Sequence, residues 1–168
     1  AYGMHKSGDR CFDNAVQRAA EWICGMQSKN GGFASFDADN DHTYLNEIPF
    51  ADHGALLDPP TEDVSARCAM LLSRLGDSEA FRSVKRKCLE YLLRSQEPDG
   101  SWYGRWGTNY IYGTWSVLCA LNAAGVDHQD PMVRKAVDWL VPVQNPDGGW
   151  GEEAKSDRVR AWARERTV

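Results

Sequence analysis

Long apolar runs, an excess of basic residues and clear strand signals are all missing from this sequence. No stretch of its 168 residues approaches the ~20 apolar residues that a helix needs to span a bilayer. The net charge is −5 and the pI is near 5.3, whereas nucleic-acid-binding domains carry a basic face or stripe. We therefore expect no nucleic-acid partner. The one strand-like segment, residues 33–40, is too short and too acidic to seed a sheet.

Secretion signals and paired cysteines are also missing. The chain has no basic-then-apolar leader, and it begins with Ala1 rather than Met, so we expect the natural protein to extend further at this end. The five cysteines include no CxxC pair, and the four histidines do not cluster at ligand spacing. A disulfide framework or a zinc site is therefore not expected, and reduced thiols in a cytosolic protein are the simplest interpretation.

The sequence does contain seven tryptophans and fifteen glycines, and four of the tryptophans and six of the glycines fall in a threefold repeat. Residues 21–33, 90–102 and 138–150 align without gaps as acid, aromatic, four residues, glutamine, three residues, glycine, one residue, aromatic. We call the glutamine, glycine and closing aromatic of each copy a staple. The first staple is Gln27, Gly31 and Phe33, the second is Gln96, Gly100 and Trp102, and the third is Gln144, Gly148 and Trp150.

Each staple is predicted to lie at the end of a helix. Apolar residues recur at helical spacing before each glutamine, as Val16, Ala20 and Ile23 do in the first copy. An NGG or PDG sequence then stops the helix, because proline resists continuation and glycine accepts a positive φ. The glutamine amide can tie this helix end to the start of a neighbouring helix, with the aromatic packed over the junction. We therefore predict a structural role for the staples, not a catalytic one.

Further helices are predicted between the repeats. One spans residues 62–75, behind the proline and N-cap signals at 59–61, and another spans 114–124 and ends at Gly125. Helix pairs joined by stapled turns indicate an all-α fold, an α/α solenoid or toroid. A partial toroid leaves apolar flanks for further repeats to cover.

The three staples resemble the QW motifs of the squalene and oxidosqualene cyclase family. The segments GGFASFDADN (31–40), IPFADHGALLDPPTEDVSAR (48–67) and DGSWYGRWGTNYIYGTW (99–115) resemble that family as well. The likeness extends from about residue 6 to 152 and fits the bacterial squalene–hopene branch better than the eukaryotic branch. It implies that residues 1–152 are part of the C-terminal catalytic α/α-barrel domain, a partial (α/α)6 barrel.

The resemblance also implies a reaction. Family members cyclise squalene, a neutral C30 polyene, to hopene or hopanol after a strong acid protonates the terminal double bond. The positive charge then migrates along the chain as rings close. Aromatic faces stabilise a cation by ~2 kcal/mol or more when desolvated, and they do not act as bases. A dry, preorganised pocket supplies most of the remaining stabilisation.

By this resemblance, four residues are candidates for binding the substrate. Phe36 falls where an aromatic lines the cavity, and Tyr is familiar there. Trp106 falls near the initiation end. Phe50 and His53 fall near the far end, where some members have Phe in place of His53. Without the resemblance, each would be interpreted as ordinary core packing.

Asp63, Arg67 and Tyr112 are the candidate catalytic residues. Asp63 and Arg67 are four residues apart on one predicted helix and so share a face; taken alone they indicate a surface ion pair of little energetic value. The resemblance implies that they support the initiating acid and that Tyr112 orients it. Arg67, where some members have His, cannot relay a proton, so we expect a fixed charge that keeps Asp63 ionised.

The family's initiating acid belongs to a DxDD motif, which this chain lacks; the sequence 36–40, FDADN, is interpreted as a loop. The chain alone is therefore expected not to cyclise squalene. Residues 153–168 form a charged, Arg-rich tail unlike the expected continuation. A truncated product, a frame-shifted end and a pseudogene all stay open.

Several alternatives also stay open. Oxidosqualene, sesquarterpene and class II diterpene cyclases share the superfamily, and non-catalytic α/α repeat modules share the helix pairs. Prenyltransferase β-subunits share the toroid but need a zinc site of Asp, Cys and His that is not found here. The resemblance implies squalene as substrate, no cofactor or metal, monotopic association with the cytoplasmic face of the bacterial membrane, and compatibility with a homodimer.

Overall fold

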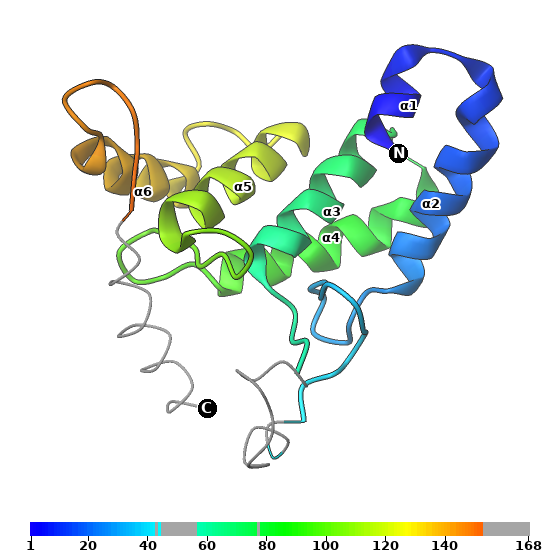
Figure 1. Cartoon of the computed structure of the whole chain (residues 1–168), viewed down its shortest axis with the longest axis horizontal. Helices are drawn as coiled ribbons and strands as arrows, with labels where there is room; N and C mark the ends of the chain where they lie inside the picture. Colours follow the sequence, from blue (N-terminus) through cyan, green and yellow to red (C-terminus); the bar gives the residue numbers. More distant parts are fainter. Residues whose placement is uncertain (43, 45–56, 77, 153–168) are drawn as a thin grey trace.

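The computed structural model describes residues 1–42, 44, 57–76 and 78–152, and this part of the chain is all-helical (Figure 1). Its elements are α1 (Tyr2–Ser7), the 3-10 turn η1 (Arg10–Phe12), α2 (Asp13–Gly25), α3 (Glu62–Arg74), α4 (Glu79–Arg94), α5 (Asn109–Ala123), α6 (Pro131–Leu140) and the 3-10 turn η4 (Val141–Val143). Within these residues the only β-pairing is an isolated bridge between Asn40 and Asp58. The predicted all-α class is confirmed.

The helices form two rows. In the first, which we call the staple row, α2, α4 and α6 each end in a staple. In the second row, α3 packs against α5, and each also packs on a staple-row helix, α3 on α4 and α5 on α6. Figure 1 shows the resulting order, from α1 and α2 beside the N-terminus, through α3 and α4, to α5 and α6. No helix in the described ranges is long and apolar enough to cross a membrane.

The core lies between the two rows. Its buried members come from both rows and from two staples: Phe33, Ala66, Ala69, Cys88, Leu92, Trp102, Val117, Ala120, Leu121 and Ala136. The α4 helix buries one face, with Phe81, Cys88 and Leu92 inside. The α5 helix is more enclosed and buries polar as well as apolar side chains, among them Thr114 and Ser116. This pattern identifies α5 as a central helix.

The predicted helix ends were correct for α3 but wrong for α5. The α3 helix runs from Glu62 to Arg74, close to the expected 62–75. The α5 helix begins at Asn109, five residues before the predicted start at Thr114. Thr108 makes no side-chain cap, and a distant carboxylate, Glu152, accepts the first N–H groups of the helix instead. The residue that caps the start of α5 therefore lies far from that start in the sequence.

The first two staples join neighbouring helices of the staple row. The Gln27 amide donates to the carbonyl of Gly31 at 2.8 Å and to that of Val84 in α4 at 2.9 Å. The Gln96 amide repeats this arrangement with Gly100 and with Met132 in α6, both at 3.0 Å. These bonds tie the loop at the end of one helix to the N-terminal part of the next helix in the staple row, as the sequence led us to expect.

The glycines of these staples allow two chain segments to touch. Gly31 and Gly100 have φ of 94° and 102°, a region that favours glycine. A β-carbon on Gly31 would lie 2.5 Å from the carbonyl oxygen of Lys87, and one on Gly100 would lie 2.6 Å from that of Lys135. Both positions therefore require glycine for conformation and for space.

The closing aromatics connect the staples to the second row. The backbone N–H of Phe33 donates to the Ser65 hydroxyl on α3 at 2.8 Å, and that of Trp102 donates to the Thr114 hydroxyl on α5 at 2.9 Å. Trp102 also donates from its indole to the Leu92 carbonyl at 2.7 Å. Each of these two staples thus holds three helices together, two from its own row and one from the other.

The third staple has the same internal geometry but binds one partner fewer. Gln144 donates to the Gly148 carbonyl at 2.7 Å, and Trp150 donates to the Leu140 carbonyl at 3.0 Å. Within the described residues, no second carbonyl accepts from Gln144. Trp150 is 47% exposed, whereas Phe33 and Trp102 are buried. The third staple therefore presents the same kind of surface that each of the first two staples presents to the next helix of the staple row.

The difference between the staples gives a stability prediction. Gln96→Ala is expected to lower the free energy of unfolding by about 1–3 kcal/mol, because it removes two partly buried hydrogen bonds, one of which joins α4 to α6. The matched control Gln144→Ala removes one exposed bond and should cost a fraction of that in this chain. Urea unfolding followed by circular dichroism measures both. Equal losses for the two variants would contradict the staple assignment.

Candidate functional site

A buried carboxylate lies at the beginning of α3. Asp63 belongs to the first turn of that helix and is only 1% exposed. One oxygen, Oδ2, accepts the backbone N–H of Trp106 at 3.1 Å. The other, Oδ1, is buried and has no hydrogen-bond partner among the described residues. Buried polar atoms without partners are rare in folded proteins and concentrate at functional sites.

Two aromatic rings meet beside this carboxylate. Phe36, from the loop after the first staple, and Trp106, from the loop after the second, lie with ring centroids 5.8 Å apart in an edge-to-face arrangement at 89°. They are 70% and 52% exposed, which is unusual for such large apolar side chains. The structure therefore brings together two sequence-predicted substrate-binding residues that are 70 positions apart in the sequence (Phe36 to Trp106).

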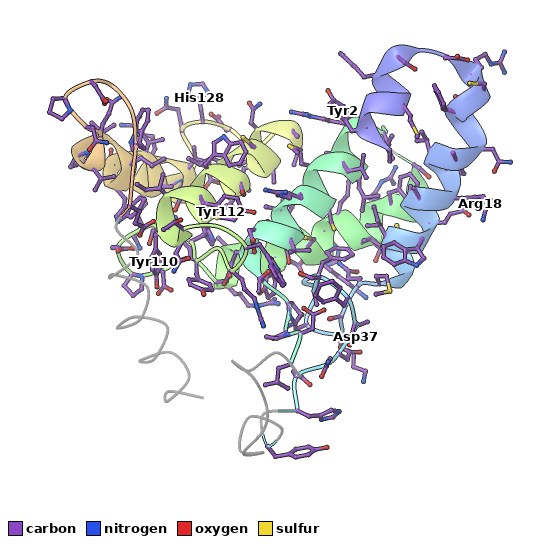
Figure 2. All side chains as sticks on the ribbon, in the orientation of Figure 1. Tyr2, Arg18, Asp37, Tyr110, Tyr112 and His128 are labelled. Carbon is purple, nitrogen blue, oxygen red and sulfur yellow. The ribbon has the colours of Figure 1, made fainter. Side chains whose placement is uncertain are left out.

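Asp58 holds the backbone of the Phe36 loop. Its buried carboxylate accepts the N–H of Ser35 at 3.1 Å, that of Asp37 at 2.8 Å and that of Phe36 itself. Figure 2 labels Asp37 in this loop. The sequence analysis missed Asp58. The available signal was an acid directly before two prolines, a position from which the carboxylate can face a neighbouring loop and not its own helix.

Arg105 holds Trp106, the second ring of the pair. Its guanidinium lies over the Trp106 ring, 5.6 Å from the centroid, and donates to the Leu57 carbonyl at 3.3 Å. A guanidinium in this position holds an aromatic ring by cation–π attraction. One face of Trp106 is therefore covered by a cation, and the ring also meets Phe36 in the edge-to-face contact.

The structure corrects the predicted pairing of Asp63 with Arg67. Arg67 is exposed and donates to the Tyr112 hydroxyl at 2.7 Å, with its guanidinium 5.4 Å from the centre of that ring. No ion pair in the described residues joins it to Asp63. The two side chains do start on one face of α3, but Asp63 turns inward to the Trp106 backbone and Arg67 extends outward to α5.

Tyr112 is seated in a loop shaped for its ring. A β-carbon on Gly104 would lie 2.5 Å from the ring, and one on Gly107 would lie 2.6 Å from it. Figure 2 shows Tyr112 on α5, close to α3. Burial raises the pKa of Tyr112, the negative charge of Asp63 raises it further, and Arg67 opposes the shift. The phenol therefore keeps its proton at neutral pH and stays a hydrogen-bond donor.

An open pocket of about 400 Å³ adjoins Tyr112 on the side of the third staple. Its lining includes Thr108, Ile111, Tyr112, Trp115, Trp150 and Glu152. Trp115 is 55% exposed, so this region adds two further accessible indoles to the aromatic surface. Glu152 is the second residue that sequence analysis missed; nothing local indicates that it caps a helix 41–43 positions earlier.

The remaining candidates divide into two groups. Phe50 and His53 lie outside the described residues, and so does the charged tail 153–168. The acids of 36–40 act within their own loop: Asp37 accepts from the Asn40 amide at 3.0 Å, and Asp39 accepts from the Lys29 backbone at 2.8 Å. Within the described ranges, no three His, Cys, Asp or Glu side chains gather as a metal site would require.

The stapled helix rows and the aromatic loops beside a buried acid define a helical-repeat protein of the α/α-toroid class. The sequence matches the family described as squalene-hopene cyclase C-terminal domain over residues 3–167. The chain belongs to this family.

The curated relatives agree with this assignment. The chain is 60% identical to a probable squalene–hopene cyclase of Sinorhizobium fredii over 91% of its own length and 24% of the relative. It is 61% identical to the squalene–hopene cyclase of Bradyrhizobium diazoefficiens, over 88% and 22%. It is 47% identical to that of Alicyclobacillus acidocaldarius, over 67% and 18%. The chain therefore spans about a quarter of these proteins or less.

Proposed function

We propose that this chain is part of a squalene–hopene cyclase, an isomerase-type enzyme that converts squalene to hopene or hopanol. The observation that carries the proposal is the exposed ring pair of Phe36 and Trp106 beside the buried Asp63. A hydrocarbon offers no charged group to bind, so a site for it must consist of apolar and aromatic surface. Relatives named as squalene–hopene cyclases match most of the chain.

The residues divide the work by their chemistry. The rings of Phe36 and Trp106 offer π-electrons to a carbocation without taking its protons. Asp63 fixes the Trp106 backbone and places a negative charge near Tyr112. Tyr112 and Arg67, joined at 2.7 Å, form a hydrogen-bonded pair that can orient an acid supplied from elsewhere in the full-length protein. That initiating acid is proposed to lie in a DxDD motif outside this chain, so the chain alone is inactive.

The location of the enzyme follows from its substrate. Squalene partitions into the bilayer, so we propose that the full-length protein is a monotopic enzyme on the cytoplasmic face of the bacterial membrane. We also propose that it forms a homodimer. Flotation of the full-length protein with lipid vesicles tests the first statement, and analytical ultracentrifugation in detergent tests the second. Protein that stays with the aqueous fraction, or sediments as a monomer, would exclude the respective statement.

The test of the function is squalene turnover by the full-length protein that contains this chain. We expect pentacyclic products, detected by gas chromatography and mass spectrometry. Trp106→Ala is expected to lower turnover by about 10–100-fold, because it removes an aromatic face that stabilises charge. The exposed Trp22 of α2, which is 63% exposed, supplies the control Trp22→Ala, which should leave turnover unchanged. Wild-type protein that forms no cyclic product would refute the proposed function.

A further inference from the structure

Glu152 occupies the N-terminus of α5. Its Oε2 accepts three consecutive backbone N–H groups, those of Asn109 at 3.1 Å, Tyr110 at 2.8 Å and Ile111 at 3.0 Å. Thr108, at the N-cap position, has no side-chain bond to this turn. A carboxylate at a helix N-terminus satisfies free donors and interacts favourably with the helix dipole. The cap of this central helix is therefore supplied by the segment of the third staple.

The capped turn leads directly into Tyr112. The Tyr112 ring lies against the loop of Gly104 and Gly107, where no β-carbon would fit, and its hydroxyl accepts from Arg67. The ring thus has little freedom to adjust if the first turn of α5 shifts. Since Glu152 holds three N–H groups of that turn, its position sets where the phenol oxygen lies relative to Arg67.

We propose that Glu152 is a positioning residue, which acts through the first turn of α5 to fix the Tyr112 hydroxyl. The inference rests on the proposed function, since Tyr112 matters only if this site supports the cyclisation. This role would also connect the third staple to the candidate catalytic residue Tyr112. Glu152 follows Trp150 by two residues, so the seating of the third staple and the geometry of Tyr112 depend on each other.

The chain contains a matched control. Asp130, the N-cap residue of α6, also caps its helix with a carboxylate, and its Oδ1 accepts one backbone N–H, that of Met132, at 2.9 Å. The α6 helix carries none of the proposed substrate-binding or catalytic residues. Asp130→Ala and Glu152→Ala therefore both remove a carboxylate cap, but only the second removes one from the helix that carries Tyr112.

The test compares these variants in the full-length protein, each with and without Tyr112→Phe. Glu152→Ala should lower kcat roughly tenfold with little change in KM, because a displaced group costs turnover more than binding. Adding Tyr112→Phe should then cause almost no further loss, since both substitutions remove the contribution of the same correctly placed hydroxyl. Asp130→Ala should change kcat by less than about twofold, and its effect should multiply with that of Tyr112→Phe.

Three outcomes separate the possibilities. A wild-type protein without cyclase activity refutes the proposed function itself. Active wild type with Glu152→Ala indistinguishable from Asp130→Ala overturns the positioning role, as does full multiplicativity of Glu152→Ala with Tyr112→Phe. If Glu152→Ala does not fold, Glu152→Gln replaces it. That variant keeps one acceptor oxygen and should give a smaller loss with the same non-additivity, and additive behaviour would overturn the proposal equally.

Discussion

An Asp63→Asn variant of the full-length protein is expected to lose at least about 100-fold in squalene turnover and to unfold at the same temperature as the parent or a higher one. The reason for the first effect is electrostatic. Asp63 places a negative charge near Tyr112 and holds the Trp106 backbone. Asparagine has the same shape and can still accept from the Trp106 N–H, so the loss would report the charge and not the fold.

The stability effect has a separate cause. Asp63 is 1% exposed, and its Oδ1 has no hydrogen-bond donor within the described part of the chain. A buried charge that is incompletely paired costs stability, and a neutral amide reduces that cost. Sites tuned for function often carry such a penalty, and neutralising it stabilises the fold while activity falls.

Turnover measured at saturating squalene, together with thermal unfolding by circular dichroism, checks both parts. Glu90→Gln is a suitable control, because Glu90 is a partly exposed acid that pairs with Arg86 at 2.6 Å on the surface of α4. It should change neither quantity by much. Near-normal turnover by the Asp63→Asn variant would show that the Asp63 charge has no role in the reaction. A variant that loses both activity and several degrees of stability would indicate a structural role instead.

The loops of the staples could be predicted from sequence because their internal bonds are local. Gln27 and Gly31 are four residues apart, and so are the equivalent residues of the other two copies, so one spacing fixes the loop in all three. The helix of Glu62–Arg74 was predictable for the same reason, since its start signals at 59–61 lie directly before it. Repetition then indicated that the helices are paired.

The parts that could not be predicted depend on contacts between distant segments. Asp58 binds a loop 21–23 residues earlier, and Glu152 caps a helix 41–43 residues earlier. Periodicity placed Asp63 and Arg67 on one face of α3 but could not fix their rotamers, which separate them. The approach of Phe36 to Trp106 was expected only from the family resemblance, and no pattern within either segment requires it.

An Asp58→Asn variant should behave in the opposite way to Asp63→Asn and lose stability along with the geometry of the site. The Asp58 carboxylate accepts three backbone N–H groups of the Phe36 loop while buried. An amide has one acceptor oxygen and would turn two donors toward those N–H groups. We expect the free energy of unfolding to fall by about 2–4 kcal/mol, since hydrogen bonds to a charged acceptor contribute about 1.5–3 kcal/mol each and do not add fully.

Asp37→Asn is the matched control for this change. Asp37 lies in the same loop, is exposed, and binds only the Asn40 amide through its side chain in the described structure. Its replacement should cost about 0.5 kcal/mol or less. Urea unfolding measured by tryptophan fluorescence separates the two variants. Equal stability of Asp58→Asn and Asp37→Asn would show that the three bonds contribute little.

The effect of Asp58→Asn on the reaction follows from the position of Phe36. Once the loop backbone is released, the Phe36 ring no longer has a fixed place against Trp106, whose own ring stays held by Arg105. One wall of the aromatic surface then moves relative to the other. The proportion of incompletely cyclised products should rise, and adding Phe36→Ala should change it little further, because both substitutions remove the same ring from the same place. Product profiles that respond independently to the two substitutions would show that Asp58 acts on the site by some route other than Phe36.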